Sequence, residues 1–149
     1  MRIIPFLFLA MMLMATHATA TAADNGSTHV RALLVTASKE AGTSDPSLAE
    51  FEPTLRRILR FESFRLAGEG SAAVSTPGQA NIGLSRGQAL AITAEKSDAR
   101  GVHLRIDWQD KGRSLMTTGL VLRPGVPAVL GGPSTGKAGE VWAVILIAN

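Results

Sequence analysis

The sequence contains no cysteine and no tyrosine, and only three histidines and two tryptophans. Without cysteine the chain can form no disulfide bond, no thiolate metal site and no thiol nucleophile. Long hydrophobic runs are also scarce, and the longest one lies at the N-terminus, over residues 3–14. The fold must therefore be held together by side-chain packing and hydrogen bonds alone.

The N-terminal segment has the three-part layout of a secretory signal peptide. Arg2 precedes the apolar run, and small residues with A-x-A motifs follow it. The run of about 12 residues is too short to span a bilayer, which requires about 20. We expect residues 1–22 to be cleaved and residues 23–149 to form a single domain, periplasmic or secreted, with no integral membrane span. An uncleaved anchor or a buried helix is the alternative for this segment.

Positive and negative charges are nearly balanced. The chain has 15 Lys and Arg residues against 12 Asp and Glu residues, and one of these arginines, Arg2, lies in the segment expected to be cleaved. Because the two signs are interspersed along the chain, no nucleic-acid-binding surface is predicted.

The densest basic cluster is LRRILRFESFR, residues 55–65. Its four arginines are the candidate partner-binding residues Arg56, Arg57, Arg60 and Arg65. Arginines interleaved with large apolar residues are typical of a contact surface for an acidic protein, lipopolysaccharide or an anionic lipid. Alternatively, the arginine stems cover the apolar residues of a helix-to-strand junction, and nearby glutamates such as Glu52 and Glu62 neutralise their charge.

The fold class is predicted from the alternation of polar and apolar residues. In residues 101–110, GVHLRIDWQD, every second residue from Val102 to Trp108 is apolar, which is typical of a half-buried strand. Residues 29–40 carry apolar side chains on both faces, which indicates a strand covered on both sides. With further short runs joined by glycine-containing turns, the pattern predicts a mainly β fold, an antiparallel β-sandwich or open barrel. The expected core residues are Leu34, Leu55, Ile92, Leu104, Ile106, Trp108, Leu120, Leu122, Val144 and Leu146.

One short α-helix is predicted within residues 46–59. Asp45 can cap a helix whose first residue is Pro46. Apolar residues then recur at helical spacing, but Pro53 interrupts them. Either the helix starts again at Pro53, or a short first turn leads into a helix over about 52–59.

A near-match to a phosphate-binding motif lies close to the C-terminus. Gly131, Gly136 and Lys137 have the spacing of G-x-x-x-x-G-K-[ST]. The motif requires a hydroxyl residue where this chain has Ala138, and a following helix where the chain has β-rich sequence. We therefore expect no nucleotide site, a Gly-Gly-Pro turn at 131–133 and a solvated lysine.

No other pattern indicates catalysis or metal binding. His29 and His103 lack a partner at metal-ligand spacing, and no G-x-S-x-G motif marks a nucleophilic serine. Asp107 and Asp110 are close in sequence but have the positions of ordinary exposed charges. No catalytic residue, no cofactor and no metal site is predicted.

Two segments carry a resemblance to a group of proteins. They are SDPSLAEFEPTLRRILRFESFRLAGEGSAAVSTPG and LVLRPGVPAVLGGPSTGKAGEVWAVILIAN, which cover most of residues 23–149. The chain resembles short exported bacterial proteins that share a D-P-x-L…P-x-L-R-R…R-F-x-S-[YF]-x-L stretch and a closing V-L-G-G-P…G hydrophobic strand. The resemblance brings no established activity, and it implies that the closing glycines serve backbone geometry. Phe64 stands where tyrosine is expected, so a phenol hydroxyl is not essential there.

These observations predict an exported, non-enzymatic interaction module that binds another envelope protein or an anionic surface polymer. Exposed strand edges and the basic helix end are its expected contact sites. The alternative is a small exported hydrolase acting on a cell-wall polymer, which needs two convergent carboxylates, or a serine beside His29 or His103. A third alternative, a sugar-binding sandwich, needs Trp108 or Trp142 exposed.

Overall fold

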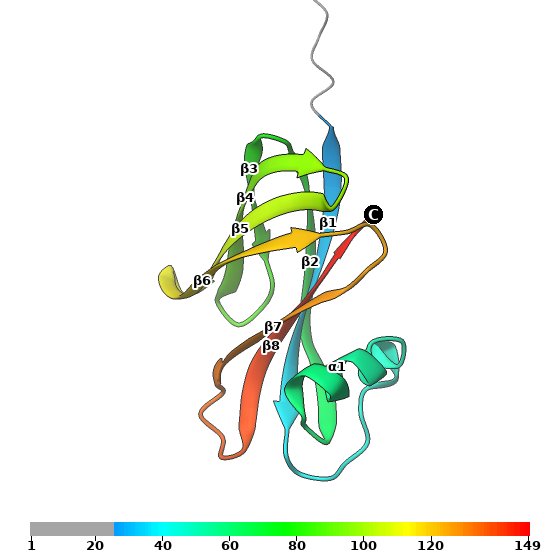
Figure 1. Ribbon diagram of the computed structural model, residues 1–149. Helices are drawn as coiled ribbons and strands as arrows, with labels where there is room; N and C mark the ends of the chain where they lie inside the picture. Colours follow the sequence, from blue (N-terminus) through cyan, green and yellow to red (C-terminus); the bar gives the residue numbers. More distant parts are fainter. Residues whose placement is uncertain (1–25) are drawn as a thin grey trace, which may run out of the picture.

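Two antiparallel sheets and one short helix make up the fold in the computed structural model, which describes residues 26–149. The strand order is β2-β1-β8-β7 in the first sheet and β3-β4-β5-β6 in the second sheet (Figure 1). In chain order the elements are β1 (Ser27–Ser38), a 3-10 turn (Pro46–Leu48), α1 (Glu52–Leu59), β2 (Ser63–Ser75), β3 (Gly78–Gly83), β4 (Gln88–Asp98), β5 (Gly101–Asp110), β6 (Arg113–Leu122), β7 (Ala128–Ser134) and β8 (Glu140–Ala148). The predicted β-sandwich with one short helix is confirmed. The predicted signal peptide, residues 1–22, lies outside the described residues.

β1 lies between β2 and β8 and is buried on both faces. Its even-numbered apolar residues, from Val30 to Leu34, face the second sheet in the main core. Its odd-numbered ones, from Leu33 to Ala37, belong to a separate core on the outer face, together with residues of the helical segment. The two-sided pattern predicted for residues 29–40 is therefore correct, and the first sheet is the middle one of three layers.

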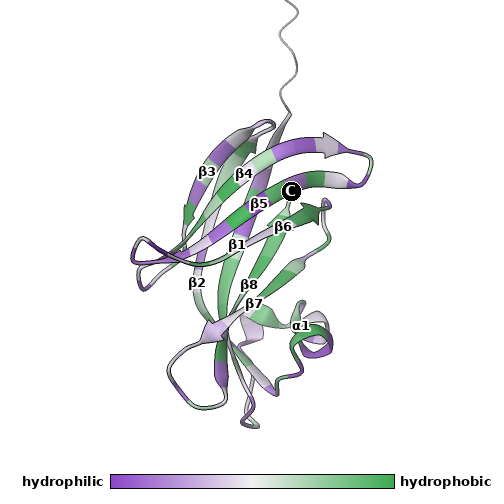
Figure 2. Ribbon diagram, turned by 60° about the vertical axis from the view of Figure 1, so that its left-hand side comes forward, coloured by the Kyte–Doolittle hydropathy of each residue, from purple (hydrophilic) through white to green (hydrophobic). Residues whose placement is uncertain are grey.

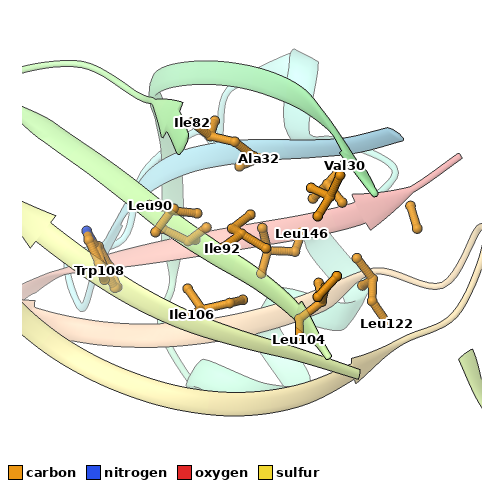
Figure 3. Packing of buried hydrophobic residues seen from close by; sticks show 14 of the residues in the cluster. Val30, Ala32, Ile82, Leu90, Ile92, Leu104, Ile106, Trp108, Leu122 and Leu146 are labelled. Atoms are coloured by element: carbon orange, nitrogen blue, oxygen red, sulfur yellow. The ribbon is translucent and has the colours of Figure 1, made fainter. Parts of the chain in front are cut away.

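The main core fills the space between the two sheets, where side chains of β1, β4, β5 and β8 meet (Figure 3). Trp108 is fully buried, and its Nε1 donates a hydrogen bond of 2.8 Å to Oε1 of the buried Gln88. This bond satisfies the polar group that the indole carries into the core. Every expected core residue is buried except Leu120, which lies on the edge strand β6 and is only partly covered.

The outward face of the second sheet is polar. Hydrophilic and hydrophobic bands alternate along β4 and β5 in Figure 2. Along β5, alternate residues from Val102 to Trp108 are buried, and the residues between them are partly or fully exposed. The polar and apolar residues of this segment alternate because successive side chains of the strand point to opposite faces of the sheet.

The helical segment covers the outer face of the first sheet. Asp45 Oδ1 accepts a hydrogen bond of 3.0 Å from Ser47 N and caps the 3-10 turn that begins at Pro46. α1 follows, with Pro53 in its first turn, where the missing backbone N–H breaks no helical bond. The observed arrangement is therefore the second of the two predicted, a short turn leading into a helix over 52–59. The side chains that this segment packs on the sheet are Leu48, Phe51 and Leu55.

Gly131 and Gly132 form part of strand β7, so the turn predicted at residues 131–133 is wrong. β7 continues through these residues to Ser134 with a bulge opposite β8, and the chain reverses only at residues 135–139. Gly132 lies against the Trp108 ring, and a Cβ atom at this position would collide with it. Gly132 allows β7 to approach the core closely. A glycine needed for close approach looks the same in the sequence as a glycine needed for a turn.

Candidate ligand-binding cavity

The first sheet continues past the second sheet toward the end of the molecule where α1 lies (Figure 1). Its inner face forms the floor of a cavity of about 490 Å³ there, and the walls come from the β3–β4 turn, the β7–β8 turn and the segment after β1. The polar residues that line it are Thr36, Ser38, Glu40, Ser63, Arg65, Arg86, Lys137 and Glu140.

The cavity floor consists of cross-strand rows of β2, β1 and β8. Thr36 pairs with Arg65 on β2 and with Trp142 on β8, so these three residues lie in one row. In the next row, farther from the main core, Ser38 pairs with Glu140 on β8. The inner face of β1 thus changes from apolar to polar toward the cavity.

Arg86 reaches the cavity from the β3–β4 turn. Gln88 N donates to Ser85 O at 2.9 Å, and the φ angle of Arg86 is 55°, a positive value as in a type I′ turn. A hydrogen bond of 2.7 Å from Ser85 Oγ to Ala67 O ties the turn to β2. The guanidinium carbon of Arg86 lies 6.0 Å from the centroid of the Trp142 ring, within cation–π range. Both the backbone and the charged end of this arginine are therefore held in place.

Three cations and two anions line the cavity, so its formal charge is +1. Lys137 Nζ lies 3.9 Å from Glu40 Oε2, and because both side chains are exposed this ion pair contributes little. Glu140 Oε1 accepts a hydrogen bond of 2.9 Å from a threonine hydroxyl of the β7–β8 turn. Between residues 26 and 149, no ion pair involves Arg65 or Arg86. The pKa of Asp45 is lowered mainly by hydrogen bonds from Ser47 and to a smaller extent by the charge of Arg65, so Arg65 acts on this carboxyl only at longer range than an ion pair. Both guanidinium groups therefore keep N–H donors that a ligand can reach.

The four arginines singled out in the sequence do not form one surface. Arg56 lies on α1 and is paired with Glu52 Oε1 at 2.7 Å and with Glu62 Oε2 at 3.6 Å, as the charge-neutralised interpretation predicts. Arg57 and Arg60 are exposed at the same helix end. Arg65 has the opposite orientation, because its neighbour Phe64 is buried in the outer core while Arg65 lines the cavity on the inner face.

The structure brings Arg65 together with Arg86, Lys137 and Trp142 instead. These residues come from β2, the β3–β4 turn and the β7–β8 hairpin, so no spacing in the sequence relates them. One local signal existed for Arg86. It precedes Gly87 at the turn position where asparagine, aspartate or glycine is preferred.

Lys137 lies in the β7–β8 turn and is followed by a strand rather than by a helix. Two backbone N–H groups of the phosphate-like motif are already bonded within the chain. Gly136 N donates to Ser134 Oγ at 3.1 Å, and Lys137 N donates to Thr135 Oγ1 at 3.3 Å. A phosphate-binding loop needs such N–H groups to point at its ligand, so this hairpin lacks the required geometry.

The histidines and aspartates considered for catalysis lie outside the cavity. His103 Nε2 lies 2.8 Å from Asp98 Oδ2. In the described part of the chain, no serine hydroxyl forms a hydrogen bond with His29 or His103. Asp107 accepts hydrogen bonds from Ser114 and Gln109, which hold the pKa of its carboxyl below the ordinary value of 3.8. Over residues 26–149, no cluster of three His, Asp or Glu side chains could hold a metal ion.

The two tryptophans bear on the sugar-binding alternative. Trp108 is 0% exposed and offers no face to a sugar ring. Trp142 is partly buried against the main core, with Arg86 over its ring. Neither indole is therefore open for stacking on a sugar ring, so any sugar bound by this chain would have to be held by polar and charged groups instead.

No protein-family model, no curated protein and no solved structure matches this chain. The resemblance to short exported bacterial proteins therefore stays a prediction. Among residues 26–149 no helix is long and apolar enough to cross a membrane. The function has to be inferred from the cavity itself.

Proposed function

We propose that this chain is an exported, non-enzymatic interaction module that binds another envelope protein or an anionic surface polymer, and that the cavity is its binding site. One observation carries the proposal. Arg65 and Arg86 line one concave site, and no carboxylate in the described residues pairs with either. Guanidinium groups bind carboxylate and phosphate oxygens through paired N–H donors, and concave sites remove such groups from water more completely than flat surfaces do.

The cavity is a better anion site than the helix end. Arg56 is engaged by two glutamates, which leaves Arg57 and Arg60 as separate exposed charges on a short helix. Exposed single charges of this kind contribute little to specific binding. Arg65 and Arg86 are exposed as well, but they line one concave site instead of standing alone. The backbone of Arg86 is also tied down and its guanidinium lies over Trp142, so less conformational freedom is lost on binding.

The proposal has two parts, export and binding, and each has its own test. Cell fractionation with N-terminal sequencing of the exported protein tests cleavage near residue 22. Crosslinking in the native envelope, followed by mass spectrometry, and titration of residues 23–149 with anionic polymers test binding. We expect a specific captured partner or a saturable polymer complex. Retention of the full chain in the cytoplasm, or neither kind of binding, would overturn the proposal.

The hydrolase alternative rests on one specific observation, which is that Glu40 and Glu140 line the same cavity. Paired carboxylates in a cleft are the machinery of glycoside hydrolysis. The Glu40 side chain is 73% exposed, however, and a general acid needs burial to hold its proton at neutral pH. Release of reducing ends from cell-wall polymer by the wild-type chain, lost in Glu140→Gln, would support hydrolysis over simple binding.

A further inference from the structure

We infer that the cavity binds a sugar residue bearing one carboxylate, presented as a repeating unit of an acidic polysaccharide. The inference rests on the proposed function and names the chemistry of its ligand. The sugar carboxylate contacts Arg65 and Arg86, and the sugar hydroxyls contact the polar residues of the cavity floor.

The charge of the cavity selects a group with a single negative charge. With three cations and two carboxylates in the lining, a monoanion balances the formal charge of +1. A doubly charged phosphate monoester would leave one negative charge in the cavity uncompensated. A carboxylate also matches the planar fork of an arginine, which can donate two parallel hydrogen bonds to it.

The other groups in the cavity suit the hydroxyls of a sugar ring. A sugar hydroxyl both donates and accepts hydrogen bonds, so its site needs both kinds of partner. Thr36 and Ser38 offer hydroxyls that do either, and the Glu140 carboxylate accepts. An acidic peptide supplies carboxylates as well, but it has no ring of hydroxyls to bond with these groups. The volume of about 490 Å³ lies within the range of small-molecule sites, about 300–1,000 Å³.

Trp142 orients the arginine in this site rather than stacking on the sugar. Arg86 occupies one face of the indole at 6.0 Å, and the ring itself packs against the main core. A ligand that draws the guanidinium away from the ring or presses it closer will change the environment of Trp142. Since Trp108 is fully buried, a change in tryptophan fluorescence on binding reports on Trp142.

The turn geometry supplies a variant that removes the Arg86 side chain without straining the backbone. At a φ of 55°, glycine is less strained than arginine, so we expect Arg86→Gly to keep the turn. A matched control lies in the adjacent turn, where Lys111 has a φ of 50° and its N–H donates to Gly87 O at 2.8 Å. Lys111→Gly removes one positive charge from the same backbone conformation, outside the cavity lining.

The experiment is a titration of residues 23–149 with galacturonic acid oligomers, followed by calorimetry and by tryptophan fluorescence. Neutral dextran, dextran sulfate and polyglutamate are titrated in parallel. We expect saturable binding of the galacturonic acid oligomers, weakened tenfold or more in Arg86→Gly and in Arg65→Gln. Lys111→Gly and Arg57→Gln are expected to bind within about twofold of the wild type, because exposed charges outside the cavity contribute little to binding.

Several outcomes would overturn the inference. Equal weakening in Lys111→Gly and Arg86→Gly would mean that overall charge, not the cavity, governs binding. Equal or tighter binding of dextran sulfate or polyglutamate would refute the carboxylate-bearing sugar. Capture of an envelope protein without any binding of acidic sugar would overturn this inference and leave the proposed function standing. No binding of any kind would remove both.

Discussion

The guanidinium of Arg86 and the indole of Trp142 lie 6.0 Å apart, although one belongs to a turn of the second sheet and the other to a strand of the first. The hydrogen bond from Ser85 Oγ to Ala67 O, at 2.7 Å, links the two sheets at the same place. The mouth of the cavity is thus built where the sheets meet, and its shape depends on how they pack.

Arg86→Gly is expected to change the free energy of unfolding by less than about 1 kcal/mol. Relief of the positive φ is worth roughly 1 kcal/mol, and loss of an exposed cation–π contact costs about 0.5–1 kcal/mol. Urea unfolding followed by circular dichroism measures the balance, and the emission of Trp142 should change in the folded state. A loss of several kcal/mol would show that Arg86 has a structural role, which would weaken its use as a binding probe.

Gly132→Ala is expected to destabilise the fold by about 1–3 kcal/mol, because the new methyl group would collide with the Trp108 ring in a close-packed core. Gly83→Ala is the control, since a Cβ at this strand position meets nothing within 4 Å. Thermal and urea unfolding of the two variants give the comparison. Equal stabilities would mean that β7 can shift away from Trp108 at no cost.

Gln88→Leu is expected to lower the free energy of unfolding by about 1–3 kcal/mol, because the indole N–H of Trp108 would lose its acceptor in the core. The exposed Gln79 on β3 provides the matched control, and Gln79→Leu should stay within about 0.5 kcal/mol of the wild type. Urea titrations on both variants decide the point. A stable Gln88→Leu protein would imply that another acceptor, or water, reaches the indole.

Ser114→Ala is expected to raise the pKa of Asp107 toward its ordinary value of 3.8, because the Ser114 hydroxyl is the main cause of its lowering. A carboxyl with a lowered folded pKa stabilises the protein above its unfolded pKa, and this contribution disappears as the pH falls through the folded pKa. The variant should therefore be less stable than the wild type at neutral pH, with the difference vanishing in strong acid. Carboxyl NMR titration and unfolding as a function of pH test this, with Ser71→Ala, an exposed residue of β2, as control.

Much of the fold could be predicted because its signals are local. The alternation along β5 and the two-sided apolar pattern of β1 follow from side chains pointing to opposite faces of a strand. The helical segment follows from the Asp45 cap and from the position of Pro53. The segment 131–133 was misassigned because glycine has the same local signature in a turn and beside a packed aromatic ring.

The candidate site could not be predicted in the same way. Arg65 was identified, but with three helix arginines that lie on the other side of the first sheet. Its actual companions, Arg86 and Lys137, carry no pattern that relates them to it. Cross-strand rows and facing turns bring together residues that are far apart in the chain, and only the pairing of strands specifies which ones.

The sequence by itself determined the β-rich class, the covered central strand, the short helix and the exclusion of thiol and disulfide chemistry. These properties follow from composition and from periodicity over a few residues. The tertiary structure decided which charges are neutralised, as at Arg56, and which are gathered in a cavity, as at Arg65 and Arg86. The physical reason is that the electrostatics and shape of a site depend on distances in space, which are set by how the two sheets pack together.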